Sequence, residues 1–189
     1  MFVEALLLGQ EKANLVAEST LPLIWTRHIA DSLQLLPLAP DAKIWVDLGS
    51  GGGFPGIPIA CALADAPGAM VHLVESNGKK ADFLREAVHK IGLPVQVHQE
   101  RAEKFGESWA EAVGVVTARA LAPLKTLCGQ VFPFIARGTL GLLPKGQDVD
   151  AELTEAAKYW SIQAEKVPSV TNPAGSIVVV RGLQRIKKT

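Results

Sequence analysis

The stretch VDLGSGGGFPG, residues 46–56, decides the fold of this chain. A short apolar strand, predicted over residues 44–48, runs into five glycines, and an apolar helix is predicted from residue 55 to about residue 64. Glycine lets the backbone adopt positive φ angles and approach a ligand without a Cβ clash. A strand, a tight turn and a helix start in this order present backbone N–H groups to a nucleotide-like ligand. The stretch therefore predicts a cofactor cradle at the head of a parallel sheet.

The bulk composition narrows the class of protein. The chain has 189 residues, of which 48% are hydrophobic, enough for one domain with a sizeable core. Because 19 basic side chains balance 19 acidic ones, an RNA partner would need a local basic face. No apolar run approaches the ~20 residues that span a bilayer, and the N-terminus has no basic region typical of a signal peptide. Two cysteines without a CxxC or Cys/His cluster predict no disulfide framework and no metal site, and favour a cytoplasmic protein.

Strand-like and helix-like segments alternate from residue 43 onward. Predicted strands cover residues 44–48, 70–74, 94–98, 113–118 and 138–143, and predicted helices cover 55–64, 78–91, 102–110, 120–136 and 148–160. Two last strands, near 162–167 and 177–181, are joined by a connection too short for a helix, which favours an antiparallel return. The pattern predicts an α/β fold with a mixed, mostly parallel seven-stranded sheet and helices on both faces. Residues 1–40 are predicted to be a small N-terminal helical extension ahead of a domain spanning 41–189.

The glycine pattern alone does not show which cofactor the loop binds. It satisfies both G-x-G-x-x-G, typical of NAD sites, and D-x-G-x-G-x-G, typical of enzymes that use S-adenosylmethionine. Glu75, at the end of the second strand, can accept hydrogen bonds from a ribose diol in either class. Three features favour S-adenosylmethionine. Asp47 is expected near the amino-acid part of this cofactor, and Glu103 near its adenine amino group. The third feature is the antiparallel pairing expected for the last two strands. Asp47 could instead satisfy backbone N–H groups of the turn, and Glu103 could be an ordinary surface residue of a helix.

Six motifs together resemble a known family. They are RHIADS at 27–32, VDLGSGGGFPGIP at 46–58, VESNGKK at 74–80, RAE at 101–103, ARA at 118–120 and LPKG at 143–146. Over residue 14 to the end, the chain resembles the RsmG (GidB) family, ribosomal RNA small subunit methyltransferase G. The resemblance implies a Rossmann-like class I methyltransferase fold and S-adenosylmethionine-dependent methylation of guanine N7 in small-subunit (16S) ribosomal RNA. Relatives usually carry a longer N-terminal helical segment, so the extension is expected to be shorter here.

The candidate cofactor residues lie at the ends of the first four strands. The resemblance places contacts at Gly49, Phe54, Ala102, Glu103 and Arg119. The full candidate set is Asp47, Gly49, Ser50, Gly51, Gly53, Phe54, Glu75, Ser76, Ala102, Glu103 and Arg119. No catalytic residue is assigned beyond Arg119, which could orient substrate or cofactor at a strand end, or form a structural ion pair.

Basic residues provide the candidate RNA-binding face. They are Arg27, His28, Lys79, Lys80, Lys125, Lys145, Arg181 and Arg185, with Lys187 and Lys188 extending the basic tail. The simpler interpretation is solvated surface, with Arg27 and Asp31 as an i,i+4 pair on a helix.

The expected chemistry needs no general base. Guanine N7 carries a free lone pair and no proton, so methyl transfer in line requires orientation and charge stabilisation only. Cys61 and Cys128 are expected in the core, not as nucleophiles, and the four tryptophans as core or half-buried residues. Two alternatives remain open: an NAD-dependent oxidoreductase, although the only tyrosine, Tyr159, lies on a late helix, and a non-catalytic RNA-binding module. We expect a monomer whose partner is small-subunit ribosomal RNA or its particle, with neither a metal ion nor a membrane.

Overall fold

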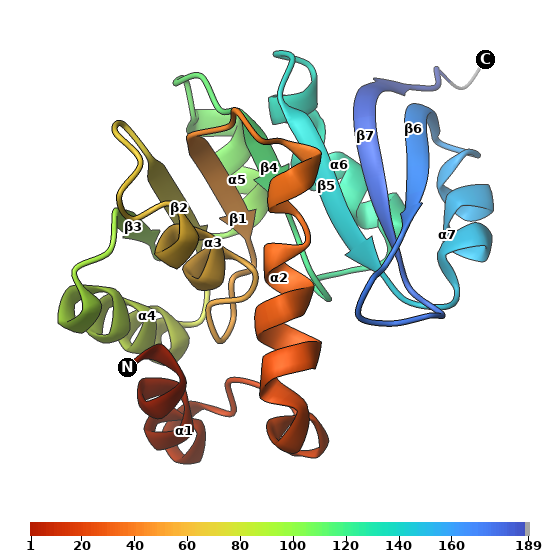
Figure 1. Ribbon diagram of the computed structural model, residues 1–189. Coiled ribbons are helices and arrows are strands. Elements are labelled where there is room, and N and C mark those ends of the chain that lie inside the picture. The colour runs from red at the N-terminus through yellow and green to blue at the C-terminus, as the bar shows by residue number, and fades with distance from the viewer. Residues whose placement is uncertain (188–189) are drawn as a thin grey trace.

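One seven-stranded sheet organises the computed structural model, which describes residues 1–187 (Figure 1). The strand order is β3-β2-β1-β4-β5-β7-β6. Strands β1 to β5 pair in parallel, and β7 pairs antiparallel with both β5 and β6. The mixed, mostly parallel sheet predicted from the sequence is confirmed. The strands are β1 Ile44–Leu48, β2 Met70–Val74, β3 Val95–His98, β4 Val115–Thr117, β5 Leu140–Lys145, β6 Trp160–Pro168 and β7 Ser176–Arg185.

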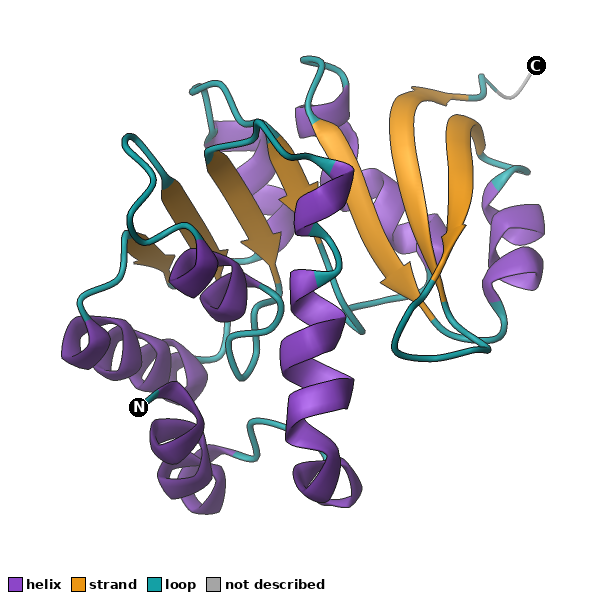
Figure 2. Ribbon diagram, viewed as in Figure 1, coloured by secondary structure: helices purple, strands orange, loops and turns teal. Residues whose placement is uncertain are grey.

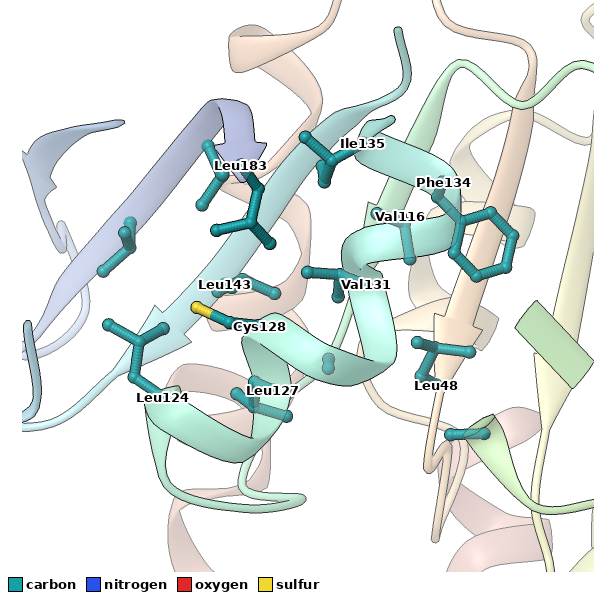
Figure 3. Packing of buried hydrophobic residues seen from close by; sticks show 14 of the residues in the cluster. Leu48, Val116, Leu124, Leu127, Cys128, Val131, Phe134, Ile135, Leu143 and Leu183 are labelled. Atoms are coloured by element: carbon teal, nitrogen blue, oxygen red, sulfur yellow. The ribbon is translucent and has the colours of Figure 1, made fainter. Parts of the chain in front are cut away.

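Helices cover both faces of the sheet (Figure 2). Neighbouring residues of a strand point to opposite faces, so Val115 and Val116 of β4 belong to different halves of the core. One half lies beneath α5, α6 and α7, and Figure 3 shows Val131 and Phe134 of α6 in it. The other half lies beneath α3, α4 and the N-terminal helices. The helices are α1 Phe2–Ala13, α2 Asp31–Leu33, α3 Gly56–Ala62, α4 Gly78–Ile91, α5 Ala102–Ser108, α6 Leu124–Ile135 and α7 Val149–Ala156.

The N-terminal segment is helical but irregular. After α1 come a 3-10 helix, η1 (Glu18–Leu23), a π-helical stretch, η2 (Trp25–Ala30), the short α2, and a second 3-10 turn, η3 (Leu36–Leu38). Buried Ile24 and Leu35 share a core cluster with Val115 of β4 and Leu142 of β5. The segment therefore covers the face over β4 and β5 that α3 and α4 leave open. Residues 1–40 and 41–187 share one hydrophobic core, and their division into an extension and a domain stays a prediction.

Helix boundaries differ from the prediction where the backbone leaves the helical region. The helix predicted from residue 120 begins at Leu124, because Ala120 has φ +52° and Pro123 stands extended at the N-cap. A proline also disfavours helical geometry in the residue before it. The helix predicted over 148–160 ends at Ala156, and Trp160 already belongs to β6.

Two burial predictions are wrong. Cys61 is exposed on α3, whereas Cys128 is buried as predicted. Trp25 is 64% exposed, although Trp45 and Trp160 are buried. Both errors fall on helical segments that lie over the sheet, where one side of the helix necessarily faces solvent. None of the helices in residues 1–187 combines the length and apolar character that a membrane crossing needs.

Candidate active site

The loop after β1 is folded by hydrogen bonds to the end of β2. Both Gly49 N and Ser50 N donate to Val74 O, at 2.8 and 3.1 Å, and Ser50 Oγ donates to Asp47 O at 2.9 Å. Gly49 has φ +70°, and a Cβ there would lie 2.5 Å from Leu121 Cδ1. A side chain is therefore excluded at Gly49 both by the backbone conformation and by the β4–α6 loop.

Asp47 lies beneath this loop. Its side chain is completely buried, and Oδ2 accepts a hydrogen bond from Gly56 N at 3.1 Å. Oδ1 is also buried and has no hydrogen-bond partner among the described residues. Burial raises the pKa of Asp47 from 3.8 to about 7, outweighing the opposing influence of the neighbouring Ser50 hydroxyl and Gly56 N–H. Asp47 thus fastens the start of α3 to the end of β1, which is the structural role that the sequence left open.

Glu75 closes β2 and faces the loop. Its Oε2 accepts from Gly51 N at 2.9 Å, and its Oε1 accepts from Asn77 N at 2.7 Å. A carboxylate offers about four acceptor positions, so each oxygen keeps one lone pair for a ligand. The same side chain therefore shapes the loop and presents two acceptors to the space beside it.

Glu103 stands on the opposite side of that space, in the first turn of α5. Gln130 Nε2, from α6, donates to Glu103 Oε1 at 2.7 Å, and this bond holds the pKa of Glu103 below its ordinary value. Gln130 Oε1 is buried without a hydrogen-bond partner within residues 1–187. Sequence reasoning missed Gln130; the available signal was one amide on the otherwise apolar buried face of the helix.

Arg119 follows β4 and reaches across to the N-terminal segment. Its Nη2 donates to His28 Nδ1 at 2.9 Å, its Nη1 donates to Arg27 O at 3.0 Å, and its guanidinium lies 5.3 Å from the centre of the Phe54 ring. Because Arg has only donors, His28 Nδ1 accepts and the ring proton sits on Nε2, which donates to Thr20 Oγ1 at 2.8 Å. Burial, followed by the charge of Arg119, lowers the pKa of His28 to about 4, so the imidazole is neutral at physiological pH.

Asp31 is the anionic partner of Arg119. Asp31 Oδ2 lies 3.4 Å from Arg119 Nη1, and Thr171 Oγ1, from the β6–β7 loop, donates to Asp31 Oδ1 at 2.6 Å. The predicted surface pair between Arg27 and Asp31 is therefore wrong: among residues 1–187 no such ion pair forms. Asp31 instead joins three segments that are far apart in the sequence.

The loop after β1, Glu75, Glu103 and Arg119 border one cavity of about 530 Å³, outside the carboxyl ends of the parallel strands. It lies where the strand order reverses between β1 and β4, the usual ligand position in open α/β sheets. The volume is within the range of small-molecule sites. The wall combines backbone N–H groups, carboxylates and one buried guanidinium, which suits a ligand with hydroxyl, amine and carboxylate groups. It includes Leu15, Thr20, Arg27, His28, Gly49, Ser50, Gly51, Phe54, Glu75, Ser76, Lys80, Ala102, Glu103, Arg119 and Gln130.

Comparison with known proteins identifies the family. The model of GidB, rRNA small subunit methyltransferase G, matches residues 1–179. The chain belongs to this family. Ribosomal RNA small subunit methyltransferase G of Bradyrhizobium sp. strain BTAi1 is 58% identical, over 97% of this chain and 83% of that protein. The same-named protein of Bradyrhizobium sp. strain ORS 278 is 55% identical, with the same two coverages.

Solved structures share the fold at low sequence identity. An rRNA methylase from Streptococcus thermophilus superposes with a TM-score of 0.55 at 15% identity, over 81% of this chain and 94% of that chain. Cofactor-bound Rv0187 from MTB gives 0.64 at 18% identity, over 96% and 90%. The GidB-family chain therefore has the Rossmann-like fold of class I methyltransferases, and it is an enzyme of the methyltransferase class.

Most predicted cofactor residues of this GidB-family enzyme line the cavity. Asp47 and Gly53 do not: Asp47 lies beneath the loop, and a Cβ at Gly53 would lie 2.6 Å from Ile57 Cδ1, so both shape the loop from inside. Those that line it are Gly49, Ser50, Gly51, Phe54, Glu75, Ser76, Ala102, Glu103 and Arg119.

The predicted RNA-binding residues divide by position. Arg27, His28 and Lys80 line the cavity, with His28 buried in its wall. Lys79 instead lines a groove between α1 and α4. Lys145 is buried in a second, smaller cavity beyond β5.

Three further cations of the predicted set lie away from the cavity. Lys125 lies 3.9 Å from Glu155 and over the Tyr159 ring. Arg181 pairs with Glu165, and Arg185 lies over Trp160; both are on β7, at the edge of the sheet where the parallel strands begin. The RNA role of all three stays a prediction, and Arg181 and Arg185 do not lie at the carboxyl ends of the parallel strands. Lys188 lies outside the described residues. Within residues 1–187, no group of three or more His, Cys, Asp or Glu side chains is arranged to hold a metal ion.

Proposed function

We propose that this protein transfers a methyl group from S-adenosylmethionine to N7 of a guanine in the RNA of the small ribosomal subunit. The observation that carries the proposal is the cavity at the β1–β4 reversal in a chain of the GidB family. Its wall offers separate acceptors and donors for each part of the methyl donor.

The residues present fit that cofactor. The two free lone pairs of Glu75 suit a ribose diol, and Glu103 on the facing wall suits an adenine amino group. The bend at Gly49, which has no room for a Cβ, lets the backbone approach the methionine part. Arg119 uses three of its five N–H groups within the protein, so two remain for a carboxylate. The unpaired Gln130 Oε1, buried beside Glu103, is a further acceptor for the adenine side.

The proposed reaction requires the protein to position the two reactants, but not to transfer a proton. S-adenosylmethionine supplies a methyl group on a cationic sulfur, whose C–S bonding electrons stay on sulfur while the N7 lone pair forms the new bond. N7 carries no proton, so none has to be removed. The carboxylates that line the cavity, Glu75, Glu100 and Glu103, each already have a protein partner. Fixed orientation of two reactants contributes up to ~7–11 kcal/mol, and the protein must also stabilise the positive charge that the guanine acquires.

The two other classes of function are less well supported. An oxidoreductase would need a proton-relay residue at the strand ends, and Tyr159 lies beside Lys125, beyond α6. A non-catalytic RNA-binding module would not need a loop in which a Cβ is excluded at Gly49, Gly53 and Gly56. We further infer a cytoplasmic protein that acts as a monomer on ribosomal RNA.

Two experiments test the proposal, one for the methyl donor and one for the RNA that accepts the methyl group. Calorimetric titration is expected to show binding of S-adenosylmethionine and none of NAD. Incubation with labelled methyl donor is expected to label small-subunit particles or protein-free small-subunit RNA, at one guanine, with mapping that places the methyl group on N7. Preference for NAD, or methylation of another base or atom, would overturn the proposal.

A further inference from the structure

A second cavity adjoins the first. It has a volume of about 230 Å³ and lies outside the carboxyl ends of β4 and β5. The two cavities share Arg27, Arg119 and Ala120, so the loop after β4 is the wall between them. Ala120 has φ +52°, a conformation that costs free energy in a residue with a Cβ and that concentrates at functional sites. A group held in the second cavity would therefore lie next to whatever the first cavity presents at Arg119.

Glu152 gives this second cavity an unused acceptor. It stands in the first turn of α7 with its side chain 26% exposed. All of its protein contacts go to one oxygen: Leu124 N donates to Oε2 at 2.5 Å, and Lys145 Nζ lies 2.7 Å from Oε2. Within residues 1–187 no hydrogen bond to Oε1 is formed. The carboxylate is thus fixed at one end and open at the other.

Three other charged residues of this cavity, Asp31, Arg119 and Lys145, have partners within the protein. Both oxygens of Asp31 are occupied, Oδ1 by Thr171 and Gln34 and Oδ2 by Arg119. Lys145 is almost completely buried, and besides the contact with Glu152 it donates to Ala122 O at 3.2 Å. The cavity consequently offers one open carboxylate oxygen to a ligand with hydrogen-bond donors. Arg27, which also lines it, has no ion pair among residues 1–187 and remains available to a phosphate of the same ligand.

We propose that Glu152 reads the Watson–Crick edge of the target guanine, with Oε1 accepting hydrogen bonds from the N1–H and the exocyclic N2 amine. The inference rests on the proposed function and assigns a substrate-recognition residue to it. Guanine places two donors side by side on that edge, whereas adenine has an unprotonated N1 that a carboxylate would repel. Lys145 and Leu124 N act as positioning groups for the carboxylate.

The same carboxylate also suits the reaction. Methylation at N7 makes the purine cationic, so an anion on the edge remote from N7 stabilises the product-like charge without touching the attacking lone pair. A site that hydrogen-bonds a substrate group rejects an analogue lacking that group far more strongly than an apolar pocket can. Glu152 would therefore contribute both base selection and rate.

The test combines a base analogue with a matched pair of variants. Small-subunit RNA is assembled with guanosine or inosine, which lacks the N2 amine, at the mapped position, and kcat/KM is measured for each. Wild type is expected to lose about ten-fold or more with inosine, as expected for one lost hydrogen bond to a charged group. Glu152→Gln keeps an oxygen for Leu124 N and Lys145 but turns an amide toward the donors. It is expected to lower kcat/KM with guanine about 100-fold and to reduce the guanine-to-inosine ratio toward one. Asp150→Asn, on the same helix with its side chain 76% exposed, is the control and should behave as wild type.

Binding measurements separate this inference from the function on which it rests. Affinity for S-adenosylmethionine should be unchanged in Glu152→Gln, because Glu152 does not line the first cavity. If wild type methylates no guanine at all, the proposed function fails. If wild type methylates its guanine and inosine equally well, or if Glu152→Gln keeps the full guanine-to-inosine ratio, only the assignment of Glu152 is overturned. The comparison of the two bases with wild-type protein needs no variant, so equal rates with guanine and inosine would overturn the assignment even if Glu152→Gln does not fold.

Discussion

The buried carboxyl of Asp47 should make the fold less stable as pH rises. In the folded chain burial raises the pKa of Asp47 to about 7, against an ordinary value of 3.8. Between these pH values the folded state holds a proton that the unfolded state has lost. The free energy of unfolding therefore falls with rising pH over this window. At 1.36 kcal/mol per pKa unit, the full effect is about 4 kcal/mol, complete once the pH exceeds about 7.

Asp47→Asn isolates this contribution. The amide has nearly the same shape, can still accept from Gly56 N through its oxygen, and carries no charge at any of these pH values. Between pH 5 and pH 8 the wild-type free energy of unfolding should fall by about 3 kcal/mol relative to that of the variant. Urea unfolding followed by circular dichroism at pH 5, 6, 7 and 8 measures the difference directly. Asp65→Asn, which removes an exposed carboxylate in the turn after α3, controls for the loss of one negative charge.

The reasoning is refuted if the stability curves of wild type and Asp47→Asn run parallel from pH 5 to pH 8. Parallel curves would mean that Asp47 titrates in the folded chain as it does in the unfolded one, and that its burial costs the ionised form nothing. A constant offset would then reflect packing or hydrogen bonding of the amide. A difference that grows with pH only for Asp47→Asn, and not for Asp65→Asn, would assign the titration to the carboxyl beneath the loop.

Three further changes probe the site. Gly49→Ala should lower the free energy of unfolding by ~1–3 kcal/mol and weaken cofactor binding, because the added Cβ is both strained at positive φ and too close to Leu121. Gly68 has a similar φ but nothing within 4 Å of an added Cβ, so Gly68→Ala should lose only the free energy of the strained backbone conformation. Urea unfolding of the two variants measures the difference. Glu75→Gln should weaken S-adenosylmethionine binding about 10- to 100-fold in a calorimetric titration, because it replaces an acceptor of Gly51 N or Asn77 N by a donor. Arg119→Ala should lower kcat/KM at least ten-fold, with Arg119→Lys recovering little because an ammonium lacks the fork geometry; an Arg119→Ala protein of full activity would place the site elsewhere.

Features set by local sequence could be predicted from the sequence. The order of strands and helices follows from apolar periodicity and turn residues, and the antiparallel final pair follows from the short connection between residues 168 and 176. The loop at 49–56 and the facing carboxylates, Glu75 and Glu103, follow from their positions at strand ends. The placement of these residues could be predicted because parallel strands bring their carboxyl ends to one edge of the sheet whatever the intervening helices do, whereas their cofactor role stays a prediction.

Features set by contacts between distant segments could not be predicted in this way. Asp31 has a basic residue four positions earlier, yet it pairs with Arg119, because η2 turns that part of the N-terminal segment toward the loop after β4. The positive φ of Ala120 has no signal in an alanine. Lys145 and Glu152 are seven residues apart and belong to different elements, so no helical spacing marks them as a pair.

The N-terminal segment completes the site as well as the core. Ile24 and Leu35 cover the sheet face over β4 and β5, while His28 and Asp31, on the intervening helical turns, hold the Arg119 guanidinium. Arg119 is largely buried, and a buried cation without partners costs several kcal/mol. The position of the guanidinium between the two cavities therefore depends on the packing of residues 24–35. Substitutions in that apolar face should accordingly weaken cofactor binding and catalysis together, although none of the apolar side chains lies next to the proposed methyl-transfer position.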